Sequence, residues 1–135
     1  MATDELLDYL TTSPFAESYG TRILSLNDGI DCETPWQDDF TGNPLLRTWH
    51  GGVVSGVLEL TGLLLVMHSN GYKPCELLSI NTSYLRPTLG EHTLFTRADI
   101  VRSGKLIHTI NTVAWQKSPE APTATAALSF VSKEN

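Results

Sequence analysis

The sequence has few cysteines, no excess of basic residues and no histidine pair at metal-binding spacing, and each absence excludes a class of protein. Cys32 and Cys75 are its only cysteines, and without a visible secretory signal we expect both to stay reduced. The formal net charge of −6 argues against a general nucleic-acid binder. The four histidines are scattered, and none forms an HxxxH pair, so we expect no metal site. The run HGGVVSG lacks both GK[ST] and the GxGxxG spacing, which excludes a P-loop and a dinucleotide fingerprint.

The chain also lacks a recognisable targeting segment and a long membrane-spanning run. Its first ten residues hold no basic region followed by an apolar stretch, so no secretory signal is predicted. The most apolar stretch, Val53 to Met67, has about 15 residues, whereas a spanning helix needs roughly 20. With 135 residues, 41% hydrophobic and 18% charged, we expect one globular domain over residues 1–135, cytoplasmic and outside the membrane.

Charge is distributed unevenly along the chain. Residues 1–40 carry nine acidic residues and a single basic one, while residues 41–135 carry six acidic and eight basic residues. An anionic ligand would therefore meet the second part, although chance variation of surface charge explains the pattern equally well.

The chain is organised around one apolar stretch, Trp49 to His68. From Val53 to Met67 the apolar residues fall on every face of a helix, which predicts that this helix is buried. Glu59 lies in its middle, and a carboxylate there is costly unless it is paired or protonated. Gly56 and Gly62 stand three residues before and after it, on the same face. A buried acid whose flanks carry no side chains predicts a binding site.

Before this helix we expect a short helix and a two-stranded hairpin. The predicted elements are a helix over residues 3–12 ended by Ser13-Pro14, a strand from Tyr19 to Leu26, a turn at Asn27-Asp28-Gly29, a strand from Ile30 to about Trp36, and a loop from Asp38 to Pro44.

After the helix the apolar pattern changes to period 2, which predicts strands. The first runs to Tyr84 with Leu78, Ile80, Thr82 and Tyr84 on one face, and three more follow over residues 94–101, 106–115 and 124–131. Short turns separate all four, so we predict a meander in which chain neighbours pair antiparallel. The fold class is α+β, with one antiparallel sheet of about six strands around one long buried helix, plus a short N-terminal helix.

This order of elements resembles the hotdog fold, and three motifs resemble its thioesterase branch. His50-Gly51-Gly52 is followed by Glu59 at the spacing of the HGG motif and its acid. Ser83-Tyr84-Leu85-Arg86-Pro87 resembles the YLRP segment, and Val101-Arg102-Ser103-Gly104-Lys105 resembles the R-x-G-[RK] hairpin. Over about residues 14–132 the chain is most similar to PaaI-like and 4-hydroxybenzoyl-CoA thioesterases of the HGG type. The resemblance implies hydrolysis of an acyl-CoA thioester by a homodimer, with CoA as part of the substrate and no cofactor.

The start of the helix suits this chemistry. The first amides of a helix lack partners and carry the positive end of its dipole, and glycines let a carbonyl approach them. Such amides form an oxyanion hole for acyl transfer. The resemblance implies that Gly51 donates this amide, with Gly52 beside it, and that Glu59 acts either as general base on water or as nucleophile.

A length argument adds a second subunit. Eight residues separate Gly51 from Glu59, about 12 Å along a helix, which is too far for both to grip one thioester carbon. The acid serving a given Gly51 is therefore expected from a partner chain, in a two-fold dimer with shared sites. Whether two dimers pair into a tetramer is left open.

Several further residues near the motif each have two possible roles. By resemblance His50 orients the loop and helix, although it is also a candidate base. Trp49 is a core or pocket-wall residue. The family's Asn or Gln six residues before HGG is Pro44 here, and Asn43 is either its shifted substitute or a turn former. The family's Ser or Thr near the acid is also missing, since Leu63 and Leu77 stand there, and Thr61 or Ser79 is its candidate replacement.

Basic residues provide candidate CoA contacts. The resemblance places CoA along the edge that carries Arg86, Arg102, Ser103, Gly104 and Lys105, where Arg offers a bidentate match to phosphate. The alternative is that these are solvated surface charges.

Two other functions stay open. A hotdog hydratase or dehydratase uses different local motifs, and a non-catalytic acyl-CoA-binding dimer would tolerate the missing helper residues. The acyl group is not fixed by the sequence, although Trp49, Phe40, Leu45 and Leu46 suggest an apolar pocket for an aromatic or medium-chain acyl group.

Overall fold

The computed structural model describes residues 3–133, so residues 1–2 and 134–135 of the predicted domain lie outside it. The helices are α1 (Asp4–Thr12), α2 (Pro14–Tyr19), the 3₁₀ turn η1 (Asp38–Phe40) and α3 (Gly51–Ser69). The strands are β1 (Arg22–Leu26), β2 (Ile30–Thr34), β3 (Thr41–Asn43), β4 (Thr48–Trp49), β5 (Cys75–Tyr84), β6 (Leu94–Ser103), β7 (Ile107–Trp115) and β8 (Ala124–Ser132).

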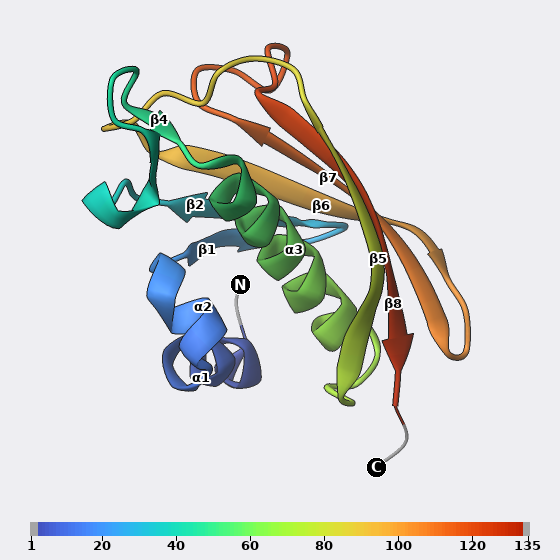
Figure 1. The fold of residues 1–135 in the computed structure, drawn as a ribbon. Coiled ribbons are helices and arrows are strands. Elements are labelled where there is room, and N and C mark those ends of the chain that lie inside the picture. The colour runs from blue at the N-terminus through green and yellow to red at the C-terminus, as the bar shows by residue number, and fades with distance from the viewer. Residues whose placement is uncertain (1–2, 134–135) are drawn as a thin grey trace.

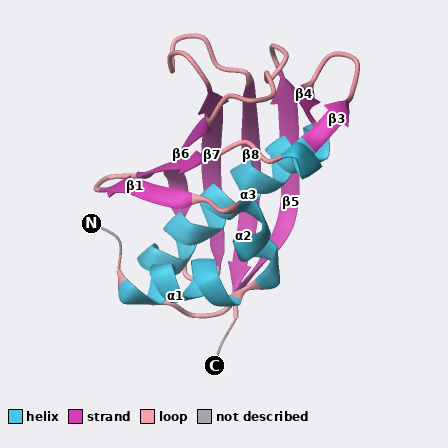
Figure 2. Cartoon of the chain, turned by 90° about the vertical axis from the view of Figure 1, so that its left-hand side faces the viewer, coloured by secondary structure: helices cyan, strands magenta, loops and turns pink. Residues whose placement is uncertain are grey.

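Six strands form one antiparallel sheet in the order β1-β2-β6-β7-β8-β5, while β3 and β4 form a separate small hairpin. The sheet curves around α3, and α1 and α2 lie on the side of α3 that faces away from β7 and β8 (Figures 1 and 2). The predicted α+β class, with one long helix, a sheet of six strands and a short N-terminal helix, is confirmed.

The composition of α3 explains its place between the sheet and the N-terminal helices. Leu58, Leu60 and Leu64 are fully buried, and side chains on every face of the helix find apolar neighbours. The helix has 19 residues and so extends beyond the apolar run of about 15, and by length and composition it could cross a membrane. Its burial in the domain core accounts for its apolar character instead.

The predicted meander is wrong in one pairing. Strands β6, β7 and β8 follow one another as expected, but β5 pairs with β8 at the edge of the sheet, and β6 pairs with β2. The connection over residues 85–93 is a crossing over the end of the sheet and not a tight turn. It places β5 at a free edge, with the four strands β8, β7, β6 and β2 between it and β1.

Other boundaries differ near the N-terminus and in β5. The Asn27-Asp28-Gly29 turn is confirmed, because Leu26 pairs with Ile30. Tyr19 is not in a strand, since Pro14 starts a second helix that ends at Tyr19 with Gly20 in the left-handed conformation (φ 68°). A bulge between Leu77 and Ser79 leaves Leu78 exposed, whereas it was expected on the buried face.

Candidate active site

The start of α3 has one amide without a partner. The His50 side chain caps the helix, with its Nδ1 accepting from the Gly52 N–H at 2.8 Å. The N–H groups of Val53 and Val54 donate to the His50 carbonyl at 3.0 and 3.1 Å. Among residues 3–133, the Gly51 N–H is therefore the first-turn amide left unbonded.

Tyr84 fixes the same turn from the edge strand. Its hydroxyl donates a 2.6 Å hydrogen bond to the Gly51 carbonyl, and its ring lies next to the position that a side chain on Gly51 would take. A Cβ on Gly51 would lie 3.3 Å from this ring. Tyr84 was not predicted as a site residue, although it belongs to the YLRP segment.

A hollow of about 400 Å³ opens beside Gly51. Its lining residues come from the β4 hairpin, the first turn of α3 and the segment that follows β5: Leu46, Thr48, Trp49, Gly51, Val54, Tyr84, Leu85, Arg86, Pro87 and Thr88. The unbonded amide of Gly51 thus lies at a largely apolar hollow, as a site for an acyl thioester requires.

Glu59 lies two turns further along α3. It is partly buried and not enclosed, which corrects the expectation of a fully buried acid. Burial raises the pKa of its carboxyl above the ordinary value of 4.5. The carboxylate has no ion pair or side-chain hydrogen bond to the described residues, and any unbonded oxygen keeps contact with solvent. A partly buried acid of this kind is a candidate for proton transfer.

The sequence suggested that Gly56 and Gly62 leave open space on both sides of Glu59, but in the structure other side chains occupy that space. A Cβ on Gly62 would lie 3.4 Å from Phe130 and 3.5 Å from Ile110, so this glycine faces the sheet. A Cβ on Gly56 would overlap the hydroxyl of Tyr19. Gly62 therefore serves helix–sheet packing, and Gly56 makes room for a tyrosine.

Neither candidate for the missing hydroxyl reaches Glu59. Thr61 is buried on the sheet side of α3, where its Oγ1 donates to the Val57 carbonyl and lies 2.7 Å from Thr96 Oγ1. Ser79 pairs with Ser129 on the outer face of the sheet. Both proposals for a replacement helper are wrong.

Two other residues from the sequence have structural roles. Trp49 is buried, donates from Nε1 to the His92 carbonyl at 3.3 Å, and packs against Trp36 and Phe40 with ring centroids 5.7 and 5.1 Å away. Asn43 is exposed, and its Oδ1 accepts from the Leu45 N–H at 2.9 Å, which is the turn-forming arrangement.

The apolar pocket expected around the loop forms only in part. Phe40 is buried in the core with Trp49, while Leu45 and Leu46 project from the loop with 93% and 69% of their surface exposed. Leu45 and Leu46 thus do not line a closed pocket within one chain, and their exposed side chains could contact another molecule.

The basic residues fall into two separate groups. Arg86 lines the hollow beside Gly51, with its guanidinium bonded to the Pro122 carbonyl. Arg102, Gly104 and Lys105 line a hollow of about 490 Å³ on the β6–β7 hairpin, with Ser103 in the same turn. This hairpin lies at the opposite end of α3 from Gly51 (Figure 1), so one chain does not bring the two groups together.

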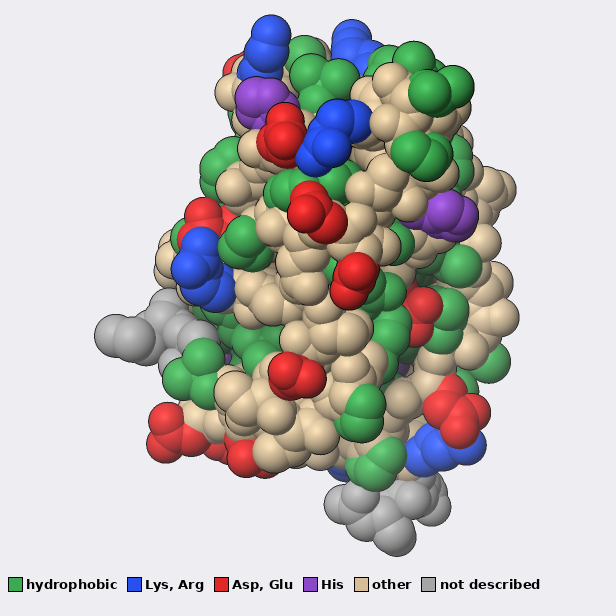
Figure 3. Space-filling model, turned by 60° about the vertical axis from the view of Figure 1, so that its left-hand side comes forward, with side chains coloured by type: hydrophobic (Ala, Val, Ile, Leu, Met, Phe, Trp, Pro, Cys, Tyr) green, Lys and Arg blue, Asp and Glu red, His purple; other side chains and the backbone are tan. Residues whose placement is uncertain are grey.

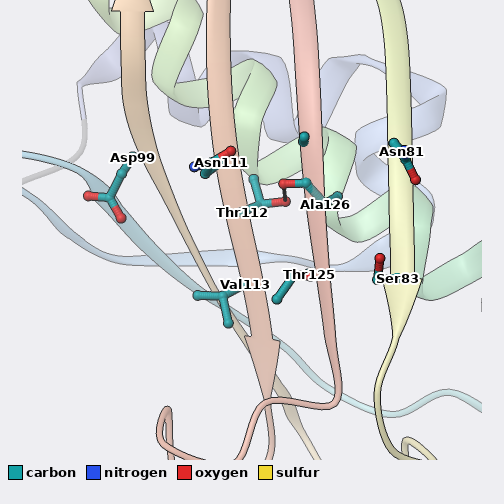
Figure 4. Close-up of a pocket in the computed structure, with 9 residues that line it drawn as sticks. Asn81, Ser83, Asp99, Asn111, Thr112, Val113, Thr125 and Ala126 are labelled. Atoms are coloured by element: carbon teal, nitrogen blue, oxygen red, sulfur yellow. Dashed lines mark hydrogen bonds between the residues drawn. The ribbon is translucent and has the colours of Figure 1, made fainter.

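The outer face of the sheet carries another shallow hollow, of about 450 Å³ (Figure 4). It is lined by small side chains such as Asn81, Ser83 and Thr125, with Asn111 and Asp99 at its side. Asp99 is ion-paired with Arg97 at 3.0 Å, so the carboxylate at this hollow is not free.

Surface charge on the face that Figure 3 shows is scattered, with acidic side chains spread over it and no single basic patch. Within residues 3–133, no group of three or more His, Cys, Asp or Glu side chains could hold a metal ion.

A six-stranded antiparallel sheet wrapped around one central helix defines a hotdog domain. A family model of the acyl-CoA thioesterase N-terminal domain matches residues 43–131, about two thirds of the chain, so the chain belongs to the acyl-CoA thioesterase domain family. Hydrolysis of a thioester is the general activity that this membership supports. A comparison with curated protein sequences finds no match.

Solved structures share the fold at low sequence identity. A putative thioesterase from Ralstonia eutropha JMP134, related to phenylacetic acid degradation, has a TM-score of 0.82 at 22% identity, covering 94% of this chain and 96% of its own. The Escherichia coli PaaI protein of the phenylacetic acid degradation operon has a TM-score of 0.81 at 14% identity, covering 96% and 91%. Zebra fish thioesterase superfamily member 2 has a TM-score of 0.81 at 18% identity, covering 96% and 94%.

Proposed function

We propose that this protein hydrolyses an acyl-CoA thioester with the Gly51 amide as oxyanion donor and Glu59 of the partner subunit as the acid of the site. The observation that carries the proposal is the Gly51 N–H, which alone among the first-turn amides of α3 has no partner within residues 3–133. The His50 carbonyl, which shares a peptide unit with the Gly51 N–H, accepts from the Val53 and Val54 N–H groups at 3.0 and 3.1 Å and so holds the orientation of this donor. The His50 ring and Tyr84 hold the neighbouring Gly51–Gly52 peptide. A donor fixed in this way stabilises charge without reorganising during the reaction.

The reaction follows from these two groups. Water attacks the thioester carbonyl carbon while the carboxylate of Glu59 takes its proton, and the carbonyl oxygen becomes an oxyanion bonded to the Gly51 N–H. Collapse of this intermediate breaks the C–S bond, and CoA leaves as thiolate. Direct attack by the carboxylate, followed by hydrolysis of the anhydride, uses the same groups, and label in Glu59 after a single turnover in ¹⁸O-labelled water would identify this route.

The second subunit is proposed because one chain keeps the two groups apart. Gly51 and Glu59 stand on one helix, about 12 Å apart along its axis. The edge strand β5 carries exposed apolar side chains, Leu78 and Tyr84, and a free edge of ten residues is a surface for strand pairing. Pairing of two β5 strands antiparallel would set two α3 helices antiparallel as well.

The same pairing accounts for the basic residues. It brings the β6–β7 hairpin of one chain toward the Gly51 end of the other, where Arg86 lies. We propose that Arg86, Arg102, Ser103 and Lys105 contact the phosphates of CoA in this dimer, in a PaaI-like site that uses no cofactor. We also propose that the protein acts in the cytoplasm, on an acyl group that its apolar hollow accepts.

Two substitutions of Gly51 test the oxyanion role. Gly51→Pro removes the N–H at the first helical position, where proline is favoured, and His50 already has the extended backbone (φ −61°, ψ 134°) that precedes proline. Gly51→Ala keeps the N–H and places the same Cβ against Tyr84, so it is the matched control.

We expect Gly51→Pro to release CoA thiol about a hundredfold or more slower than Gly51→Ala, the effect of losing one oxyanion donor. Equal rates for the two variants, with both folded, contradict the proposed role of this amide. No thiol release by the wild type from any acyl-CoA rejects the hydrolase, and a change in enoyl absorbance would then indicate a hydratase.

A further inference from the structure

The hydroxyl of Tyr19 lies over α3 at the one place where that helix has no side chain. A Cβ built on Gly56 would overlap this hydroxyl and lie 2.9 Å from the Tyr19 Cζ. Gly56 is in the middle of a helix, where glycine costs about 1 kcal/mol relative to alanine. This glycine therefore makes room for the tyrosine at the expense of helix stability.

The same hydroxyl lies beside Glu59. In an α-helix, residues three positions apart share a face, and side chains lean toward the N-terminus, so the Glu59 side chain leans toward Gly56. Burial, the larger cause, and the charge of Glu59 both raise the pKa of Tyr19. The Tyr19 hydroxyl and the Glu59 carboxyl group thus both lie near Gly56 on the surface of α3.

Neither group has another partner there. Within residues 3–133, the Tyr19 hydroxyl and the Glu59 carboxylate make no side-chain hydrogen bond, and neither is fully enclosed. Ser55, four residues before Glu59 on the same helix, is not available to the carboxylate, because its Oγ lies 2.7 Å from Thr82 Oγ1 on β5 and is hydrogen-bonded there. Tyr19 is therefore the free donor on this side of the acid.

Tyr19 is held in place by the surrounding structure. Its ring lies between Phe15 and Phe40, with centroids 5.2 and 6.0 Å away. The Gln37 side chain donates to the Ser18 and Tyr19 carbonyls at 3.1 and 3.2 Å, which fixes the end of α2. These contacts hold both the ring and the backbone of Tyr19, so the fold fixes the position of its hydroxyl.

We infer that Tyr19 is a positioning residue for Glu59. The two groups make no hydrogen bond in this structure; in the assembled site the hydroxyl donates to the carboxylate and orients it toward the substrate, taking the place of the missing Ser or Thr helper. This inference rests on the proposed function in that Glu59 is the acid of the site. Tyr19 acts through Glu59 of its own chain and does not touch the reacting carbonyl.

The first test measures the interaction between Tyr19 and Glu59 without an activity assay. A ¹³C NMR titration of the Glu59 side-chain carboxyl is recorded for wild type, Tyr19→Phe and Gly56→Ala. A donor to a carboxylate favours its charged form, so its loss should move the Glu59 titration to higher pH by about 0.5 to 1 unit. Gly56→Ala should give the same shift, because its methyl group displaces the hydroxyl, and Tyr9→Phe, on α1, should give none.

The second test reads the reaction. Tyr19→Phe should lower kcat about tenfold with little change in KM, and move the acidic limb of the kcat/KM profile to higher pH. In the Glu59→Gln background the same substitution should change the residual rate less than twofold, because a positioning residue acts through the group it positions.

Each outcome decides a different claim. An unmoved Glu59 titration in both Tyr19→Phe and Gly56→Ala overturns the inference, even if the enzyme hydrolyses acyl-CoA. An equal rate loss in wild-type and Glu59→Gln backgrounds, or a change confined to KM and acyl-chain preference, also overturns it and makes Tyr19 a pocket wall. If the titration shifts but no variant or wild type releases thiol, the pairing stands and the proposed function fails.

Discussion

The hydroxyl of Tyr84 donates a 2.6 Å hydrogen bond to the carbonyl oxygen of Gly51, which ties the edge strand β5 to the first residue of α3. The bond holds the Gly51–Gly52 peptide, which adjoins the peptide that carries the Gly51 N–H, beside the hollow that Gly51 lines. We expect Tyr84→Phe to lower stability by about 1 kcal/mol, the net value of one hydrogen bond. It should also lower kcat three- to tenfold, roughly 0.6 to 1.4 kcal/mol of transition-state stabilisation.

Tyr72→Phe is the control for this substitution. Its hydroxyl donates to Thr3 at 2.7 Å at the other end of α3, so the same chemical change should lower stability and leave kcat unchanged. Thermal unfolding and steady-state kinetics on both variants check the prediction. Equal kcat values for Tyr84→Phe and wild type would show that the Gly51 carbonyl needs no anchor.

Glu59→Gln should abolish most of the activity and stabilise the fold at neutral pH. The loss of the carboxylate should cost at least a hundredfold in kcat, the usual contribution of a general base. Burial raises the folded pKa of Glu59 above its unfolded value, so the folded state holds this proton to higher pH. Stability from this group is present below the unfolded pKa and lost as pH rises through the folded pKa.

The pH dependence follows from the same direction. The acidic limb of wild-type kcat/KM should lie above pH 4.5, since only the carboxylate accepts a proton. Denaturant unfolding of wild type and Glu59→Gln at pH 4 and pH 8 should show the variant gaining on wild type at the higher pH. A constant stability difference at the two pH values contradicts the cited effect of burial.

Gly62→Ala should be tolerated. A Cβ there would lie 3.4 to 3.6 Å from Phe130, Ile110 and Thr112, which is ordinary contact distance, and alanine stabilises a helix interior by up to about 1 kcal/mol. We therefore expect unfolding free energy equal to or above that of wild type, and full activity. Loss of activity without loss of stability would place Gly62 in the acyl site, as its position relative to Glu59 first suggested.

The two thiols should be unreactive in the folded protein. Burial raises the pKa of Cys32 to about 12 and that of Cys75 to about 11. At pH 8 the thiolate fraction is then about a hundredfold or more below that of an ordinary cysteine, and reaction with DTNB should be slowed to match. Fast labelling of the folded chain would contradict this, whereas both cysteines should react at once in denaturant.

The fold was predictable because its strongest signals are local. The all-round apolar stretch fixed α3, and Asn27-Asp28-Gly29 fixed the first hairpin, since each pattern depends only on neighbouring residues. The place of β5 was not predictable in this way, because strand order depends on packing around α3 and not on the length of the segment after Pro87. Helix α2 was missed because its six residues are too few to show a period.

The residues of the candidate site were likewise predictable only where the signal was local in sequence. Gly51 and Glu59 were found from spacing, and His50 from its place before the helix. Tyr19 and Tyr84 were missed, because each reaches α3 from an element far away in sequence. Only the space left by a glycine, at Gly56, pointed to such a contact, and sequence does not say which side chain fills it.

The most direct test of the shared site mixes two inactive variants. Gly51→Pro and Glu59→Gln chains, carrying different tags, are co-expressed, and the dimers with one chain of each are isolated and assayed for thiol release. If Gly51 of one chain works with Glu59 of the partner subunit, each such dimer has one intact site and should recover about half of wild-type activity. If both residues act within one chain, the mixed dimer has no intact site and stays as inactive as its parents, which would contradict the account.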